Sequence, residues 1–142
     1  MIYVVIDANV FVSGVITSGG KSAQILNLIQ KKKIELITSA PILEETRKVL
    51  LRPHIKEMHG FSAKQIDKKL MQITRFAKTT LGKVQLKVIQ SDLTDNKYLE
   101  CAVEGEVDYI ISGDKHLKGL KEYQGIKVLN PAAFLNLVKK GK

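Results

Sequence analysis

Short, continuous apolar segments alternate along this chain with longer segments of helical periodicity. The first apolar run covers residues 2–6 and is rich in the β-branched and aromatic residues that favour strands. A strand without alternating polar residues is buried on both faces, so its sheet must be covered by helices on both sides. Strands that alternate with helices predict a mostly parallel sheet with right-handed crossovers. We therefore expect an α/β fold, in the form of a three-layer α/β/α sandwich.

The same patterns assign a residue range to each element. Strands are predicted at 2–6, 34–38, 86–89, 107–112 and 126–129. Helices are predicted at 22–30, 39–52, 61–80, from about 94 to 104, and at 131–138. A length of 142 residues suits one domain, and no repeat, linker or low-complexity segment divides it. Residues 1–142 are therefore expected to form a single domain.

The charge of the chain is strongly basic. Lysine and arginine number 23 against 14 acidic residues, which gives a formal net charge of +9. Such a charge attracts polyanions such as nucleic acid, although a lysine-rich surface also serves simply to keep a protein soluble. The single cysteine, Cys101, excludes an internal disulfide and fits a reducing compartment. The apolar start lacks the basic segment of a secretory signal, and no span reaches membrane length, so we expect a cytoplasmic protein.

Acidic residues occur where a parallel sheet would collect them at one edge. Asp7 and Asp114 each follow an apolar strand, and sites in such sheets form at the carboxyl ends of the strands. Glu45 lies three residues after Ile42 and four before Val49, so it interrupts the inward-facing stripe of a helix. Asp95, near the start of a later helix, also falls on an inner face. The four candidates are Asp7, Glu45, Asp95 and Asp114.

Structural interpretations of these carboxylates stay open. Asp7 could cap the turn that follows its strand, Glu45 could form a partly buried salt bridge, and Asp95 could stabilise the start of its helix. Three other acids have only structural explanations, as a solvent-facing helix residue, a helix cap and a strand start at the opposite edge: Glu44, Asp92 and Asp108.

A cluster of carboxylates has a specific chemistry. Oxygen ligands suit hard cations such as Mg²⁺ and Mn²⁺. Two carboxylates about 4 Å apart repel by about 4 kcal/mol at an effective dielectric constant of about 20, so four together need a cation or bound protons. A bound cation activates water and stabilises charge on a phosphate, and hydrolysis of a phosphodiester needs both. The four acids therefore predict a divalent-metal site for phosphodiester hydrolysis.

The chain contains, in this order, the segments VVIDANVFVSG, TSAPILEETRKVL, DLTDNKYLECA and DYIISGDKHL. Together they resemble the ordered motifs of PIN-domain nucleases over nearly the whole chain. The resemblance implies an α/β/α sandwich and an endoribonuclease that hydrolyses RNA phosphodiester bonds with Mg²⁺ or Mn²⁺. The implied catalytic and metal-binding carboxylates, followed by two orienting neighbours, are Asp7, Glu45, Asp95, Asp114, Asn9 and Ser112.

Toxin-type (VapC-like) PIN ribonucleases are the members that the chain resembles. This part of the resemblance implies the toxin of a toxin–antitoxin pair, with RNA, an antitoxin protein and a second copy in a homodimer as partners. The alternative is a catalytically silent module with the same fold that only binds RNA or a partner protein.

Other motifs do not support a different chemistry. Gly20, Lys21 and Ser22 resemble the end of a phosphate-binding P-loop, but the preceding glycine has the wrong spacing, so residues 14–20 are expected to be a flexible loop. Asn9 stands where a haloacid-dehalogenase-like phosphatase has a second aspartate, so the proton transfer of those enzymes is excluded. His54 and His59 are expected in a loop as surface residues, without a zinc-binding pattern.

Overall fold

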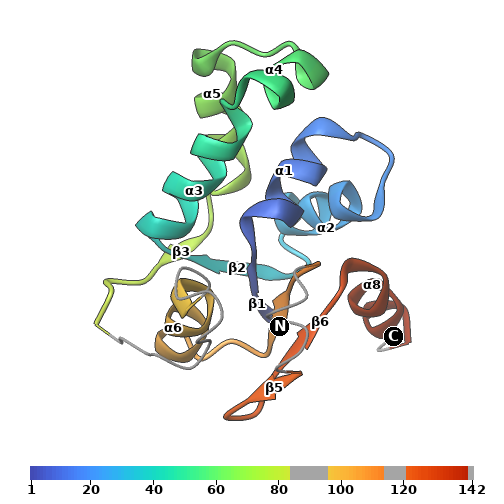
Figure 1. Cartoon of the computed structure of the whole chain (residues 1–142). Coiled ribbons are helices and arrows are strands. Elements are labelled where there is room, and N and C mark those ends of the chain that lie inside the picture. The colour runs from blue at the N-terminus through green and yellow to red at the C-terminus, as the bar shows by residue number, and fades with distance from the viewer. Residues whose placement is uncertain (84–95, 114–120, 141–142) are drawn as a thin grey trace.

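The computed structural model describes residues 1–83, 96–113 and 121–140 (Figure 1). Within these ranges, the strands form a six-stranded sheet in the order β3-β2-β1-β4-β6-β5. The strands are β1 (Tyr3–Ile6), β2 (Glu35–Thr38), β3 (Lys78–Thr79), β4 (Tyr109–Ile111), β5 (Glu122–Tyr123) and β6 (Ile126–Leu129). Neighbouring strands are parallel except for β5, which pairs with β6 in the antiparallel sense. The expected mostly parallel sheet is confirmed.

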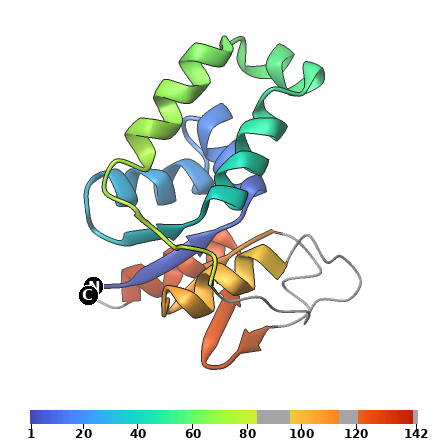
Figure 2. The same ribbon diagram turned by 90° about the vertical axis from the view of Figure 1, so that its left-hand side faces the viewer.

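The helices of the described ranges pack on both faces of this sheet. They are α1 (Ala8–Ile16), α2 (Lys21–Gln30), α3 (Ala40–Leu50), α4 (Pro53–His59), α5 (Ala63–Ile73), α6 (Asn96–Glu104) and α8 (Pro131–Lys140). Figures 1 and 2 show α6 on the side of the sheet opposite α1 and α2, while α3, α4 and α5 extend beyond the sheet as an arm. None of these helices combines the length and apolarity needed to cross a membrane.

Strand β1 separates two hydrophobic clusters. Val4 and Ile6 belong to the larger cluster, which contains side chains from α1, α2, α5 and α8. Val5 belongs to the other cluster, together with Leu99 and Ala102 of α6. Successive residues of a strand point to opposite faces, so a strand with apolar residues at every position needs a helical layer on each side. The two clusters confirm the three-layer arrangement that the apolar run predicts.

The segment after β1 is helical, so the expected flexible loop at residues 14–20 is wrong in its first part. Helix α1 begins directly after Asp7 and continues through Gly14 to Ile16. Gly14 lies so close to α2 that an added Cβ would be 2.5 Å from Cδ1 of Leu26. Close packing of α1 on α2, with Val10 and Phe11 buried beneath, keeps this segment helical. The connection to α2 is restricted to residues 17–20.

Helix α4 is a second correction, because His54 and His59 were expected in a loop. Pro53 occupies the first turn of α4, where the missing N–H of proline is tolerated. The N–H of Phe61 donates to Nδ1 of His59 at 2.8 Å, so the other ring nitrogen of His59 carries the proton and donates to the Leu50 carbonyl at 2.9 Å. His59 thus joins the end of α3 to the segment after α4, which is a structural role.

The helix predicted at 61–80 is too long. Helix α5 ends at Ile73, and Lys78–Thr79 pair with Ile37 and Thr38 as the edge strand β3. The apolar spacing of residues 61–80 continues past the end of α5, so the local pattern does not reveal the strand. The strand predicted at 86–89 lies outside the described residues.

Gly105 follows α6 and contacts β2. An added Cβ at Gly105 would lie 2.4 Å from Cγ2 of Ile37 and 3.1 Å from the Cys101 carbonyl oxygen. The left-handed backbone conformation falls on the next residue, Glu106, with a φ of 52°. A glycine is therefore required at position 105 for its small size, because α6 and β2 approach each other closely there.

We expect Gly105→Ala to lower the free energy of unfolding by about 1–3 kcal/mol, because the added methyl group overpacks the contact with Ile37. Gly19→Ala is the matched control, since a Cβ at Gly19 meets nothing within 4 Å. Urea denaturation of both variants provides the comparison. Equal stability of the two variants would contradict the packing role of Gly105.

Candidate functional site

The strand order reverses at the centre of the sheet, beside β1. β2 and β3 extend the sheet on one side of β1, and β4, β6 and β5 extend it on the other. Ile6 of β1 and Ile111 of β4 are partners in register, so the next residues, Asp7 and Ser112, follow at neighbouring carboxyl ends. Open α/β sheets form their binding sites at this kind of switch point.

Asp7 is buried at this point, with 2% of its surface exposed. Its Oδ1 accepts the N–H of Val10 at 2.8 Å and so caps α1, and its Oδ2 accepts a hydrogen bond from the Ser112 hydroxyl. The capping interpretation of Asp7 is therefore correct. A carboxylate has about four acceptor positions, so an aspartate that caps a helix can also be a metal ligand.

Glu45 reaches the same edge of the sheet from α3. Its Oε1 accepts a hydrogen bond from the Tyr98 hydroxyl, and its Oε2 lies 2.6 Å from Nζ of Lys97. The Glu45 side chain is 31% exposed. The partly buried salt bridge left open for Glu45 is therefore present, with Lys97 as its partner.

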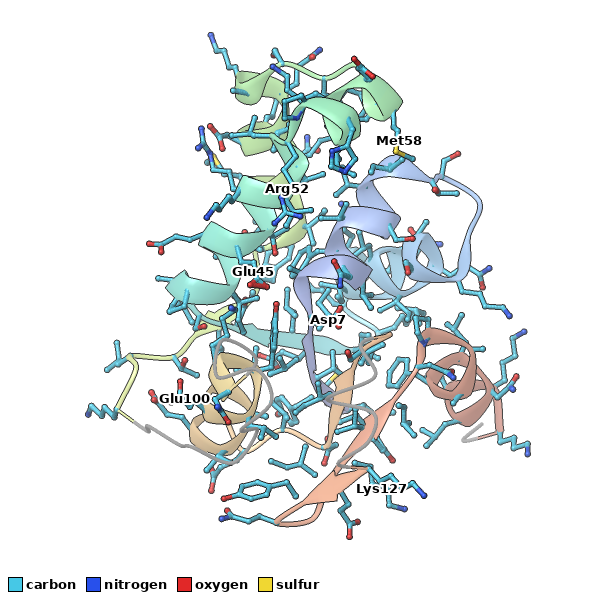
Figure 3. All side chains as sticks on the ribbon, viewed as in Figure 1. Asp7, Glu45, Arg52, Met58, Glu100 and Lys127 are labelled. Carbon is cyan, nitrogen blue, oxygen red and sulfur yellow. The ribbon has the colours of Figure 1, made fainter. Side chains whose placement is uncertain are left out.

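Tyr98 connects Glu45 to the residue that follows Asp7. The Tyr98 hydroxyl donates to Glu45 and accepts the N–H of Ala8 at 3.1 Å. Burial, and after it the hydrogen bond to Glu45, raises the pKa of the Tyr98 hydroxyl, so this group stays protonated and can donate. Two hydrogen bonds thus join Glu45 to the first turn of α1, and Figure 3 shows Glu45 and Asp7 at the same edge of the sheet.

The remaining predicted site residues have different positions. Asn9 is exposed in the first turn of α1, whereas Ser112 is fully buried and contacts Asp7. Asp95 and Asp114 lie in the ranges 84–95 and 114–120, outside the described residues. Across the described part of the chain, no three His, Cys, Asp or Glu side chains gather in a way that could hold a metal. The structure therefore brings together Asp7, Ser112 and Glu45.

Two neighbouring acids can be assigned to structural positions. Glu44 is exposed on α3, as expected for a solvent-facing residue. Asp108 lies at the opposite end of the strands, where its Oδ2 accepts the N–H of Tyr3 at 2.9 Å. The structural role predicted for Asp108 is confirmed.

Lys97 and Tyr98 are the site residues that the sequence pattern does not indicate. Tyr98 contacts a carboxylate 53 positions earlier in the chain, and the α6 periodicity alone identifies Tyr98 only as an inward-facing residue. Their place in the sequence could have identified them, because both residues closely follow the predicted site residue Asp95 in the segment DLTDNKYLECA. Only the packing of α6 beneath β1 shows that they reach Glu45.

The donor atoms at this edge suit a hard cation. Asp7 and Glu45 supply carboxylate oxygens, and Ser112 and Tyr98 supply hydroxyl groups that hold those carboxylates. Oxygen donors of this type favour Mg²⁺ or Mn²⁺ over softer metals. Asp7 and Glu45 therefore offer the ligand type that the predicted divalent cation requires.

Comparison with known proteins identifies a family and one relative. Residues 3–116 match the family model described as PIN domain. The chain is also 35% identical, over 121 residues, to the uncharacterized protein MJ1680 of Methanocaldococcus jannaschii, across 85% of this chain and 76% of that protein. The matched range of the family model contains the four predicted carboxylates, Asp7, Glu45, Asp95 and Asp114.

The capping bond of Asp7 predicts a difference in stability between two variants. Asp7→Ala removes the oxygen that caps α1, whereas Asp7→Asn keeps an oxygen at that position, and Asn caps a helix about as well as Asp. We expect Asp7→Ala to be about 1 kcal/mol less stable than Asp7→Asn in urea denaturation. Identical unfolding midpoints would show that the Val10 contact does not stabilise α1.

Proposed function

Because the chain belongs to the PIN-domain family, which has a nuclease-type fold, we propose that it is a metal-dependent endoribonuclease. One observation supports this proposal above the others. Asp7 and Glu45 come from different elements, yet Tyr98 joins Glu45 to the N–H of Ala8, directly after Asp7. Two hydrogen bonds through Tyr98 thus link Glu45 to the residue next to Asp7, at the switch point of the sheet.

The proposed site holds Mg²⁺ or Mn²⁺ through Asp7 and Glu45, with Asp95 and Asp114 completing the set on sequence grounds. When bound, such a cation activates water and stabilises negative charge on a phosphate. The protein orients the ligands. The Val10 N–H and the Ser112 hydroxyl fix Asp7, while Tyr98 fixes Glu45. Fixed ligands favour cation binding, because less freedom is lost when the site fills.

The charge of the chain supports RNA as the substrate. A net charge of +9 attracts the phosphates of a nucleic acid backbone, and Lys97 lies at the site itself. Arg52, just beyond the end of α3, is exposed, and Figure 3 places it farther along the arm from Glu45.

The toxin role, the antitoxin partner, the homodimer and the cytoplasmic location stay predictions from the sequence and its resemblance.

The test is cleavage of RNA by the purified chain in the presence and absence of Mg²⁺ or Mn²⁺. We expect metal-dependent products from the wild type, and a loss of rate of about 100-fold or more in Asp7→Asn and Glu45→Gln. Loss of a residue that only orients a metal ligand lowers activity by about 10- to 100-fold, so loss of the ligand itself should lower activity by about 100-fold or more. Glu44→Gln is the matched control, since it removes the neighbouring exposed carboxylate and should retain full activity.

Thermal unfolding of each variant separates loss of activity from loss of fold. Cleavage that continues in a chelator, or full activity in Asp7→Asn and Glu45→Gln, would contradict the proposal. RNA binding that weakens with salt, without any metal-dependent product, would instead identify a silent RNA-binding module.

A further inference from the structure

We propose that Lys97 and Tyr98 are positioning residues of the cation site that hold the two oxygens of Glu45 and affect cation binding in opposite directions. The inference rests on the proposed function of this site. Lys97 and Tyr98 are consecutive residues of α6, and each contacts a different oxygen of the Glu45 carboxylate. The hydrogen bond from Tyr98 orients the Glu45 carboxylate for a divalent cation. The ammonium group of Lys97 competes with that cation for the same carboxylate.

The hydroxyl of the buried Tyr98 makes two hydrogen bonds. Tyr98 is 2% exposed, and its hydroxyl accepts the N–H of Ala8, whose position is set by the first turn of α1. The same hydroxyl donates to Oε1 of Glu45. The position of Glu45 is therefore fixed relative to the helix that Asp7 caps. Without the hydroxyl, the buried ring would keep its place but Glu45 would gain rotational freedom, so a cation would bind more weakly.

The Lys97 contact is electrostatic. Its ammonium group lies 2.6 Å from Oε2 of Glu45, and its side chain is 16% exposed. This ion pair balances the charge of Glu45 near the buried Asp7. A divalent cation bound to Glu45 would repel the ammonium group, so Lys97 has to move away as the cation binds. Lysine has a long flexible stem and can make this movement. Loss of the ammonium group should therefore strengthen cation binding.

Opposite effects distinguish this proposal from a structural role. If Lys97 and Tyr98 only stabilised the fold, replacing either one would weaken cation binding or leave it unchanged. Tyr98→Phe keeps the ring, and Lys97→Met keeps most of the length of the side chain. Both variants thus remove one polar contact with Glu45 and little packing.

The experiment measures Mn²⁺ binding to the full chain by calorimetry, without RNA. We expect Tyr98→Phe to raise the Kd for Mn²⁺ about 10-fold or more, the effect typical of a residue that orients a metal ligand. We expect Lys97→Met to lower that Kd about two- to fivefold, the contribution of a partly exposed ion pair. Cleavage by Tyr98→Phe should recover in excess Mn²⁺ with an unchanged KM for RNA.

The matched controls are Tyr123→Phe on β5 and Lys127→Met on β6. Lys127 is exposed, and Figure 3 places it at the opposite end of the sheet from Glu45. Both controls should bind Mn²⁺ like the wild type. A change of similar size in the controls would overturn the proposal, because it would show that the effect does not depend on contact with Glu45.

The outcomes separate this inference from the proposed function. Wild-type protein that binds no Mn²⁺ would overturn the metal-dependent nuclease and this inference with it. Wild-type protein that binds Mn²⁺, with an unchanged Kd in Tyr98→Phe or an unchanged or higher Kd in Lys97→Met, would overturn this inference alone. Should Tyr98→Phe fail to fold, the Kd of Lys97→Met for Mn²⁺ still tests the inference. We expect that Kd to fall, whereas a loss of structure would raise it.

Discussion

The parallel pairing of β1 with β4 is the constraint on which the site depends. Register between Ile6 and Ile111 brings Asp7 and Ser112 to neighbouring strand ends, and the hydroxyl of Ser112 then orients the Asp7 carboxylate. The other oxygen of Asp7 caps α1, which sets the direction of the Ala8 N–H toward Tyr98. A shift of one residue in that pairing would turn these side chains to the other face of the sheet. Fold and site are therefore specified by the same contacts.

Electrostatics explains why a lysine lies among these acids. Carboxylates close together repel one another, and partial burial increases the effect because the surrounding dielectric constant is lower. The ammonium group of Lys97 lies beside the Glu45 carboxylate and balances its charge. Burial raises the pKa of the Tyr98 hydroxyl, so this hydroxyl stays protonated and donates a hydrogen bond to Glu45. In the proposed site, Lys97 is therefore a weaker substitute for the divalent cation. On this proposal, Lys97 stabilises the position of Glu45, and its displacement by the cation costs little because the ion pair is partly exposed.

Local pattern was sufficient for the features that depend on burial. Continuous apolar runs predicted the parallel sheet with helices on both faces, and the interrupted stripe of α3 separated the inward-facing Glu45 from the exposed Glu44. Pattern failed where distant segments decide the structure. Helix α1 depends on the approach of Gly14 to Leu26, β3 on pairing with β2, and the contacts of Lys97 and Tyr98 on the position of α6 beneath β1. Asp95 and Asp114 stay predictions, since they lie outside the described residues.

We propose that Asp7, which follows β1, and Glu45 of α3 bind the same cation. Anomalous diffraction from crystals grown with Mn²⁺ tests this claim most directly, because it locates the metal independently of any activity. We predict a peak at the carboxyl ends of β1 and β4, with oxygens of Asp7 and Glu45 at about 2 Å and the Lys97 ammonium group withdrawn from Glu45. A peak elsewhere, or density at this edge without Asp7 or Glu45 among the ligands, would contradict the account.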